Sequence, residues 1–194
     1  GPFDGITLLP LMAALPDCEF VGLEIKADAA KRLTERIAKR GWSTRAKIIH
    51  GQLADAVEKI GGATASAQFD AIIFFEVIEH VPHVGIALDT LASLLRDGGQ
   101  LFVSTPWGAF DRGHQPMAET RDERGHVRAM MPAELITAVE ATGELIVEEQ
   151  SGSHGEGNYG DTLHLVARKL DEGTIEERIE DWSVEHAGPL PVQF

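Results

Sequence analysis

The segment Phe69-Asp-Ala-Ile-Ile-Phe-Phe-Glu-Val-Ile-Glu-His80 decides the predicted fold. Residues 71–75 form a continuous apolar run, which is typical of a strand that is covered on both faces in a parallel sheet. Glu76, Glu79 and His80 follow at its carboxyl end, and a helical turn there would bring all three onto one face. These oxygen and imidazole groups could hold a divalent cation. Acids at a helix start also favour the positive end of the helix dipole, so a purely structural role stays open.

A second predicted strand, residues 18–25, ends in the carboxylate of Glu24 and is followed by helical spacing over residues 26–40. In open α/β sheets, an acid at such a strand end can accept both hydroxyls of a ribose. Glu24 is therefore a candidate for binding a nucleoside.

Further predicted strands alternate with helices along the chain. A strand at residues 46–50 leads into Gly51-Gln52-Leu53, and a helix at residues 86–95, closed by Asp97-Gly98-Gly99, precedes a strand at residues 100–104. Residues 151–160 join the last two strands, and their four glycines indicate a hairpin. This alternation predicts an α/β fold with a doubly wound, mostly parallel sheet.

These segments together resemble the class I S-adenosylmethionine-dependent methyltransferases over about residues 1–170. The most specific parts are Val21-Gly-Leu-Glu-Ile25, residues 69–80, and Leu94-Leu-Arg-Asp-Gly-Gly-Gln-Leu-Phe-Val-Ser-Thr-Pro106. The resemblance implies a Rossmann-like methyltransferase fold with an antiparallel last strand, and S-adenosylmethionine as the cofactor. It also implies cofactor contacts at Gly1, Gly5, Glu24, Ile25, Gln52, Leu53, Phe75 and Glu76.

Within this family, Glu-Val-Ile-Glu-His is similar to a segment of ubiquinone-biosynthesis O-methyltransferases and of small-RNA 3′-terminal 2′-O-methyltransferases. In those relatives the two acids and the histidine bind a divalent metal, which implies that Glu76, Glu79 and His80 bind magnesium or another divalent ion. The RNA-modifying relatives add a further histidine, and His126 stands in the comparable place. His126 is therefore the expected fourth ligand, with His114 as a competing candidate.

One feature of the family is not visible in the sequence. The usual first strand and its glycine-rich loop are missing, because the chain opens Gly1-Pro-Phe-Asp-Gly5 and continues into a predicted helix at residues 6–15. We expect Gly1 and Gly5 to be the tail of that loop, with the strand upstream. Gly1-Pro2 could instead be a remnant of tag cleavage.

Length and composition favour one domain in a reducing compartment. The chain has 194 residues with 43% hydrophobic content, enough for one α/β core. We expect a methyltransferase domain at residues 1–170 and an acidic C-terminal helix and tail at residues 171–194. The single cysteine, Cys18, cannot form an internal disulfide, and no transmembrane run is present. A cytoplasmic location is therefore expected.

The charge of the chain bears on its partners. Acids outnumber bases 31 to 17, which gives a net charge of −14, whereas an RNA-binding surface is usually basic. A small-molecule or glycan acceptor is therefore expected, and a nucleic acid is not. The acidic helix at residues 171–182 could pack on its own sheet, link to another domain or contact a second copy in a homodimer.

The predicted function is S-adenosylmethionine-dependent methylation of a hydroxyl group, assisted by a metal that lowers the hydroxyl pKa. Without a metal, His80 could act as the general base. Two alternatives remain from the sequence. One is an RNA 3′-terminal 2′-O-methyltransferase, and the other is a catalytically silent methyltransferase-like interaction domain.

Overall fold

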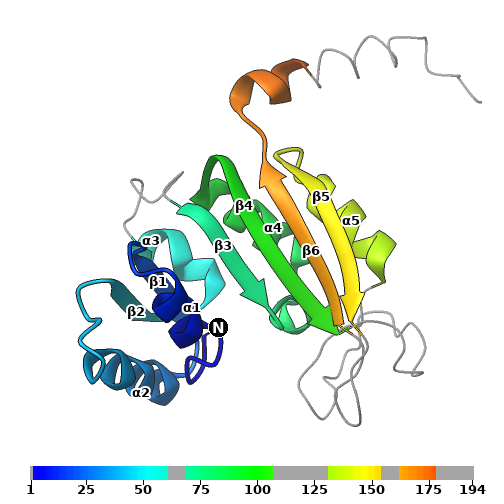
Figure 1. The fold of residues 1–194 in the computed structure, drawn as a ribbon. Coiled ribbons are helices and arrows are strands. Elements are labelled where there is room, and N and C mark those ends of the chain that lie inside the picture. The colour runs from blue at the N-terminus through cyan, green and yellow to red at the C-terminus, as the bar shows by residue number, and fades with distance from the viewer. Residues whose placement is uncertain (1, 61–68, 107–130, 154–161, 178–194) are drawn as a thin grey trace, which may run out of the picture.

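The structure is a computed structural model that describes residues 2–60, 69–106, 131–153 and 162–177 (Figure 1). Helices and strands alternate along most of this length, and residues 172–177 are also helical. In chain order the elements are α1 (Leu8–Ala14), β1 (Phe20–Glu24), α2 (Ala27–Ala38), β2 (Ala46–His50), η1 (Leu53–Asp55), α3 (Ala56–Ile60), β3 (Phe69–Phe75), η3 (Ile78–His80), α4 (Val84–Leu94), β4 (Leu95–Pro106), α5 (Pro132–Glu140), β5 (Leu145–Ser153) and β6 (Thr162–Lys169).

The strands form two sheets. The larger sheet has the order β3-β4-β6-β5, in which β3 runs parallel to β4 and β6 is antiparallel to both of its neighbours. The smaller sheet holds β1 and β2, which are parallel. The α/β class and the antiparallel last strand are thus confirmed.

The main hydrophobic core lies between the larger sheet and the helices α4 and α5, which cover one of its faces (Figure 1). Burial alternates along β6, so Leu163, Leu165 and Ala167 point into this core. A separate cluster joins α1 to α2 through Met12, Leu33 and other apolar residues. The two clusters correspond to the two sheets.

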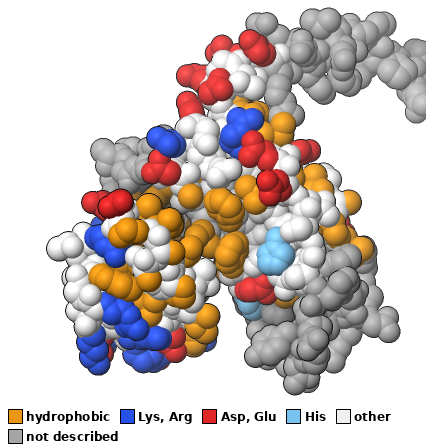
Figure 2. Space-filling view, viewed as in Figure 1, with side chains coloured by type: hydrophobic (Ala, Val, Ile, Leu, Met, Phe, Trp, Pro, Cys, Tyr) orange, Lys and Arg blue, Asp and Glu red, His pale blue; other side chains and the backbone are white. Residues whose placement is uncertain are grey.

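The described strands form two sheets and not one continuous sheet. β1 pairs only with β2 and β3 pairs only with β4, so no described strand lies between β1 and β3. Ile73 at 42% and Phe75 at 37% exposure lie on one face of β3, whereas Phe74 on the opposite face is buried in the core with α4 and α5. The prediction that this segment is covered on both faces is therefore wrong, and Val21 on β1 is likewise 38% exposed. Figure 2 shows hydrophobic side chains gathered between the part of the molecule that holds the smaller sheet and the part that holds the larger sheet.

Most predicted element bounds are close to those observed. The strand at residues 46–50 is confirmed as β2, and the predicted helices at residues 26–40 and 86–95 are α2 and α4 with slightly different ends. β4 begins earlier than predicted, at Leu95, with a register shift opposite Phe69 and Ala71. Gly98 has φ +73°, which lets the chain bend at this irregularity. Residues 172–177 of the C-terminal helix predicted at 171–182 are helical, and residues 151–153 of the predicted hairpin belong to β5. Residues 154–161 and 178–194 lie outside the described residues.

A strand placed between β1 and β3 should stabilise the chain, because it would pair two strand edges that have no partner among the described residues. We expect an apolar strand-forming segment joined ahead of Gly1 to raise the melting temperature. The rise should be roughly 4–8 °C for each 2 kcal/mol added to the free energy of unfolding. Thermal unfolding followed by circular dichroism measures this. A matched segment with a central proline cannot pair fully and should give a smaller rise. Equal melting temperatures for both segments would contradict the prediction.

Candidate cofactor and active site

The predicted functional residues gather where strands end. Glu24 is the last residue of β1 and Glu76 directly follows β3, and both strands are parallel to their neighbours. In open α/β sheets, ligands bind beyond the carboxyl ends of the strands. A ligand site is therefore expected at the carboxyl ends of β1 and β3.

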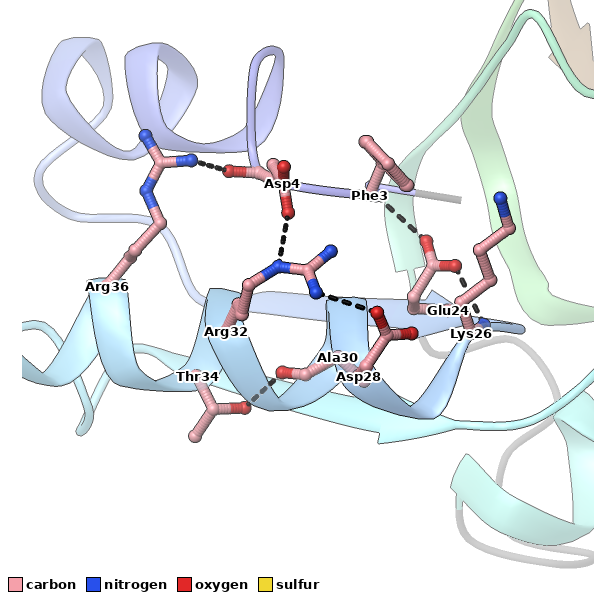
Figure 3. Close-up of polar contacts among 9 residues, drawn as sticks. All are labelled: Phe3, Asp4, Glu24, Lys26, Asp28, Ala30, Arg32, Thr34 and Arg36. Carbon is pink, nitrogen blue, oxygen red and sulfur yellow. Dashed lines mark hydrogen bonds and ion pairs between the residues drawn. The ribbon is translucent and has the colours of Figure 1, made fainter.

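Glu24 is 2% exposed, and both of its carboxylate oxygens accept hydrogen bonds. The Phe3 N–H donates to Oε2 at 2.8 Å, and the Lys26 N–H donates to Oε1 at 2.9 Å (Figure 3). A carboxylate has about four lone-pair positions, so each oxygen can accept one more hydrogen bond. That Glu24 holds two ribose hydroxyls stays a prediction.

The turn at residues 2–5 is fixed beside Glu24. The Gly5 N–H donates to the Pro2 carbonyl at 2.7 Å, and Gly5 has φ +85°. A Cβ on Gly5 would lie 2.6 Å from Leu33 Cδ1, so a larger residue would have to displace a leucine side chain as well as adopt a conformation that favours glycine. Gly1 lies outside the described residues.

Helix α2 holds this turn through two arginines. The Arg32 Nε donates to Asp4 at 3.1 Å, and another Arg32 nitrogen donates to Asp28 at 2.7 Å (Figure 3). Arg36 donates to the Asp4 carbonyl. The sequence reasoning did not identify the two contacts with Asp4, because they join residues about 30 positions apart.

The other predicted cofactor contacts differ in exposure. Ile25 is 60% exposed and Phe75 is 37% exposed, so each presents apolar surface at a strand end. Gln52 is exposed, while Leu53 is half-buried and packs against the core. Apolar walls with a few polar groups are typical of cofactor sites.

At the end of β3, two carboxylates are held by neighbouring hydroxyls of β4. Ser104 Oγ donates to Glu76 Oε1 at 2.7 Å, and Thr105 Oγ1 donates to Glu79 Oε2 at 3.3 Å. His80 Nε2 lies 3.8 Å from Glu79 Oε1. Sequence reasoning missed Ser104 and Thr105, although two hydroxyls at the end of a predicted parallel strand are a signal that could have found them.

The local conformation differs from the helical turn considered from the sequence. Glu76 has φ +51°, and the helical residues begin only at Ile78, in the 3-10 helix η3. The spacing of Glu76, Glu79 and His80 therefore does not form one face of an α-helix.

No group of three or more His, Cys, Asp or Glu side chains within the described ranges is placed to hold a metal ion. Glu76, Glu79 and His80 therefore do not form such a group as they lie, and Glu76 Oε1 instead accepts the hydrogen bond from Ser104. His126 and His114 lie outside the described residues. Metal binding by Glu76, Glu79, His80 and His126 stays a prediction.

Burial raises the pKa of the Glu79 carboxyl to about 7, and the charge of Glu76 adds to this rise. The hydrogen bond from Thr105 acts in the opposite direction but is weaker. Glu79 therefore exchanges its proton near neutral pH, directly beside His80. Such a pair can accept or stabilise a proton during a reaction.

Comparisons with known proteins agree with this geometry. A family model described as a methyltransferase domain matches residues 1–149. A ubiquinone biosynthesis O-methyltransferase from Aeromonas salmonicida is 32% identical over 95 residues, which are 45% of this chain and 40% of that enzyme. The chain thus spans less than half the length of this curated relative.

Solved structures share the fold at lower identity. A SAM-dependent methyltransferase from Methanosarcina mazei has a TM-score of 0.67 at 14% identity, covering 89% of this chain and 91% of that chain. The N-methyltransferase NodS from Bradyrhizobium japonicum, in complex with S-adenosylhomocysteine, has a TM-score of 0.60 at 21% identity, covering 83% and 72%. These likenesses confirm the Rossmann-like methyltransferase fold.

Two further observations concern the chain as a whole. Among the helices of the described residues, none has the length and apolar character needed to cross a membrane. β6 ends at Lys169 and packs into the main core, beyond the end of the family match. The domain boundary at residue 170 stays a prediction.

The raised pKa of Glu79 predicts a specific effect of pH on stability. Between pH 4.5 and about 7 the folded chain keeps a proton on Glu79 that the unfolded chain has lost, so the free energy of unfolding falls as pH rises. The full difference corresponds to about 3 kcal/mol. Glu79→Gln cannot ionise, so its stability relative to the unmodified chain should be higher at pH 8 than at pH 5.

Urea unfolding of both proteins at pH 5 and pH 8 measures this difference. Glu35→Gln, an identical change at an exposed position of α2, serves as the control and should show no such pH dependence. The same stability difference for Glu79→Gln at both pH values would contradict the raised pKa.

Proposed function

Since the chain belongs to the class I S-adenosylmethionine-dependent methyltransferases, we propose that it methylates a hydroxyl group of a small molecule or glycan. The observation that carries the proposal is the Glu79–His80 pair after β3, together with the buried, hydrogen-bonded carboxylate of Glu24 at the end of β1. The name of the Aeromonas salmonicida relative, an O-methyltransferase, supports a hydroxyl as the acceptor.

Glu24 would bind the ribose of the cofactor through its remaining lone pairs. Ile25 and Phe75 would pack against apolar parts of the ligand, since both are exposed at strand ends. The turn at residues 2–5 would cover the cofactor from the side of α2, held by the contacts of Asp4 with Arg32 and Arg36. When bound, S-adenosylmethionine supplies a methyl group on a positively charged sulfur.

His80 would take the proton of the acceptor hydroxyl as the oxygen attacks the methyl carbon and the carbon–sulfur bond breaks. The sulfur leaves as a neutral thioether, so charge balances when the proton passes to the imidazole. An ionised Glu79, whose Oε1 lies 3.8 Å from His80 Nε2, would stabilise the imidazolium. Most of the acceleration would come from holding the oxygen in line with the departing sulfur.

Metal assistance is the alternative form of this proposal. Glu76, Glu79, His80 and His126 would then bind magnesium or another divalent ion, which requires Glu76 to turn away from Ser104. Because the described side chains do not converge in this way, we propose that His80 removes the proton.

The acceptor class rests on charge. With a net charge of −14, the chain has little to attract an RNA backbone, which disfavours 2′-O-methylation of RNA. A silent interaction domain would be expected to lose the cofactor contacts, yet Glu24 is present, buried and hydrogen-bonded. A homodimer and a cytoplasmic location remain proposals.

The first test concerns Glu24. Glu24→Gln should weaken binding of S-adenosylhomocysteine by at least about tenfold, because hydrogen bonds to a charged group contribute roughly 1.5–3 kcal/mol. Isothermal titration calorimetry measures the affinity. Glu19→Gln makes the same change at an exposed residue next to β1 and should leave it unchanged. Unchanged affinity in Glu24→Gln would remove Glu24 from the site.

The second test separates the two routes of proton removal. Transfer of a tritiated methyl group to a panel of phenols, catechols and sugars measures turnover. His80→Gln should lower kcat by about 10²–10⁴, the usual contribution of a general base, and leave cofactor affinity within about twofold. His83→Gln, at an exposed neighbouring position, is the control.

Chelation by EDTA should leave this turnover unchanged if His80 is the base. Loss of turnover with EDTA and recovery with magnesium would replace the His80 route by metal assistance. Label on nitrogen or carbon instead of oxygen would contradict O-methylation.

A further inference from the structure

Ser104 holds Glu76 with both its main chain and its side chain. The register of β3 on β4 sets Ser104 opposite Phe75, the residue before Glu76. The Glu76 N–H donates to the Ser104 carbonyl at 2.9 Å, and Ser104 Oγ donates to Glu76 Oε1 at 2.7 Å. Ser104 is 4% exposed, so this contact is made by a buried residue.

Formation of β4 does not require the hydroxyl of Ser104. An alanine there would keep the pairing with Phe75 of β3 and with His164 of β6, since both pairings use the main chain. Within the described part of the chain, Glu76 is the one hydrogen-bond partner of this hydroxyl. The hydroxyl therefore acts on the position of Glu76.

Glu76 itself is in a conformation that folding alone does not favour. Its φ of +51° lies in the left-handed region, which glycine adopts freely and other L-residues avoid. It is exposed, whereas Glu79 three residues later is 2% exposed. Oε1 is taken by Ser104, and Oε2 accepts no hydrogen bond from another of the described residues. The chain thus holds an acid in a strained position with one carboxylate oxygen available.

We propose that Ser104 is a positioning residue that holds the Glu76 carboxylate near the cofactor sulfur, so that the site prefers the cationic methyl donor to its neutral product. This inference rests on the methyl transfer proposed above. S-adenosylmethionine and S-adenosylhomocysteine differ in one methyl group and in the charge on sulfur. A fixed carboxylate attracts the sulfonium and has little effect on the thioether. The preference would help release of the product after each turnover.

The hydrogen bond from Ser104 to one oxygen of the Glu76 carboxylate would produce this preference for the cationic ligand. An exposed glutamate without a fixed partner samples several rotamers, and water screens its charge. The hydrogen bond from a buried hydroxyl reduces this freedom, and the left-handed backbone sets the direction in which the side chain leaves β3. Loss of the hydroxyl should therefore weaken the preference in the same direction as loss of the charge.

The experiment is a double-mutant cycle read by calorimetry with S-adenosylmethionine and S-adenosylhomocysteine as separate ligands. Glu76→Gln should lower the preference for the cationic ligand by about three- to tenfold, as expected for one partly screened charge. Ser104→Ala should lower it in the same direction. Ser104→Ala combined with Glu76→Gln should match Glu76→Gln alone, because the serine acts through the carboxylate. Ser104→Thr, which keeps a hydroxyl, should retain the preference.

Ser93→Ala is the matched control, since its hydroxyl donates only to the Thr90 carbonyl on α4 among the described residues. It should change neither affinity. An equal loss of affinity for both ligands in Glu76→Gln would overturn the positioning role. Additive effects of Ser104→Ala and Glu76→Gln on the ligand preference of the double variant would overturn it too. A preference that disappears with EDTA would overturn it as well, because Glu76 would then act through a metal. If the unmodified chain binds neither ligand, the proposed function itself fails.

Discussion

The parallel pairing of β3 with β4 is the constraint on which the polar geometry of the molecule depends. Its register sets Phe75 opposite Ser104, so the residues after β3 meet the hydroxyls at the end of β4. A slip of one residue would turn the side chains of β3 to the opposite faces and separate both carboxylates from their donors. The hydrophobic contacts that fix this register, such as those of Phe74 and Val103 in the main core, therefore also fix the site.

Glu24 and Glu76 belong to different sheets, and no strand hydrogen bonds join the described parts of these sheets. The link is a small cluster in which Ala56 and Leu94 are buried and Leu23 and Ile72 pack against them. The distance between the ribose-binding end and the methyl-transfer end of the proposed site thus depends on helix packing around α3 and α4. Packing of this kind tolerates small shifts more easily than a shared strand ladder does. The exposed apolar edges beside it are consistent with that weaker link.

Local sequence patterns predicted much of the fold. The strand at residues 46–50 has the bounds expected from its apolar pattern, and Glu24 ends β1 as predicted. The exposure of Ile73 and Phe75 depends on which elements cover that face of β3, and the residues of β3 alone do not show this. The same holds for Ser104, which meets Glu76 across 28 positions of sequence. Periodicity indicates a strand, but it does not identify the partner of each side chain.

The two carboxylates after β3 show why the remaining sequence rules failed at this point. Helical spacing treated Glu76 and Glu79 as equivalent members of one face, whereas the structure separates them by conformation and burial. Glu79 is enclosed, and the pKa of its carboxyl rises to about 7. Glu76 remains exposed in a backbone conformation that costs of order 1–3 kcal/mol for a residue with a side chain. A glycine would remove that cost, so an acid kept there under such strain points to a role outside folding. In the proposed site, the buried Glu79 would take part in proton exchange, and the exposed Glu76 would recognise the charge of the cofactor.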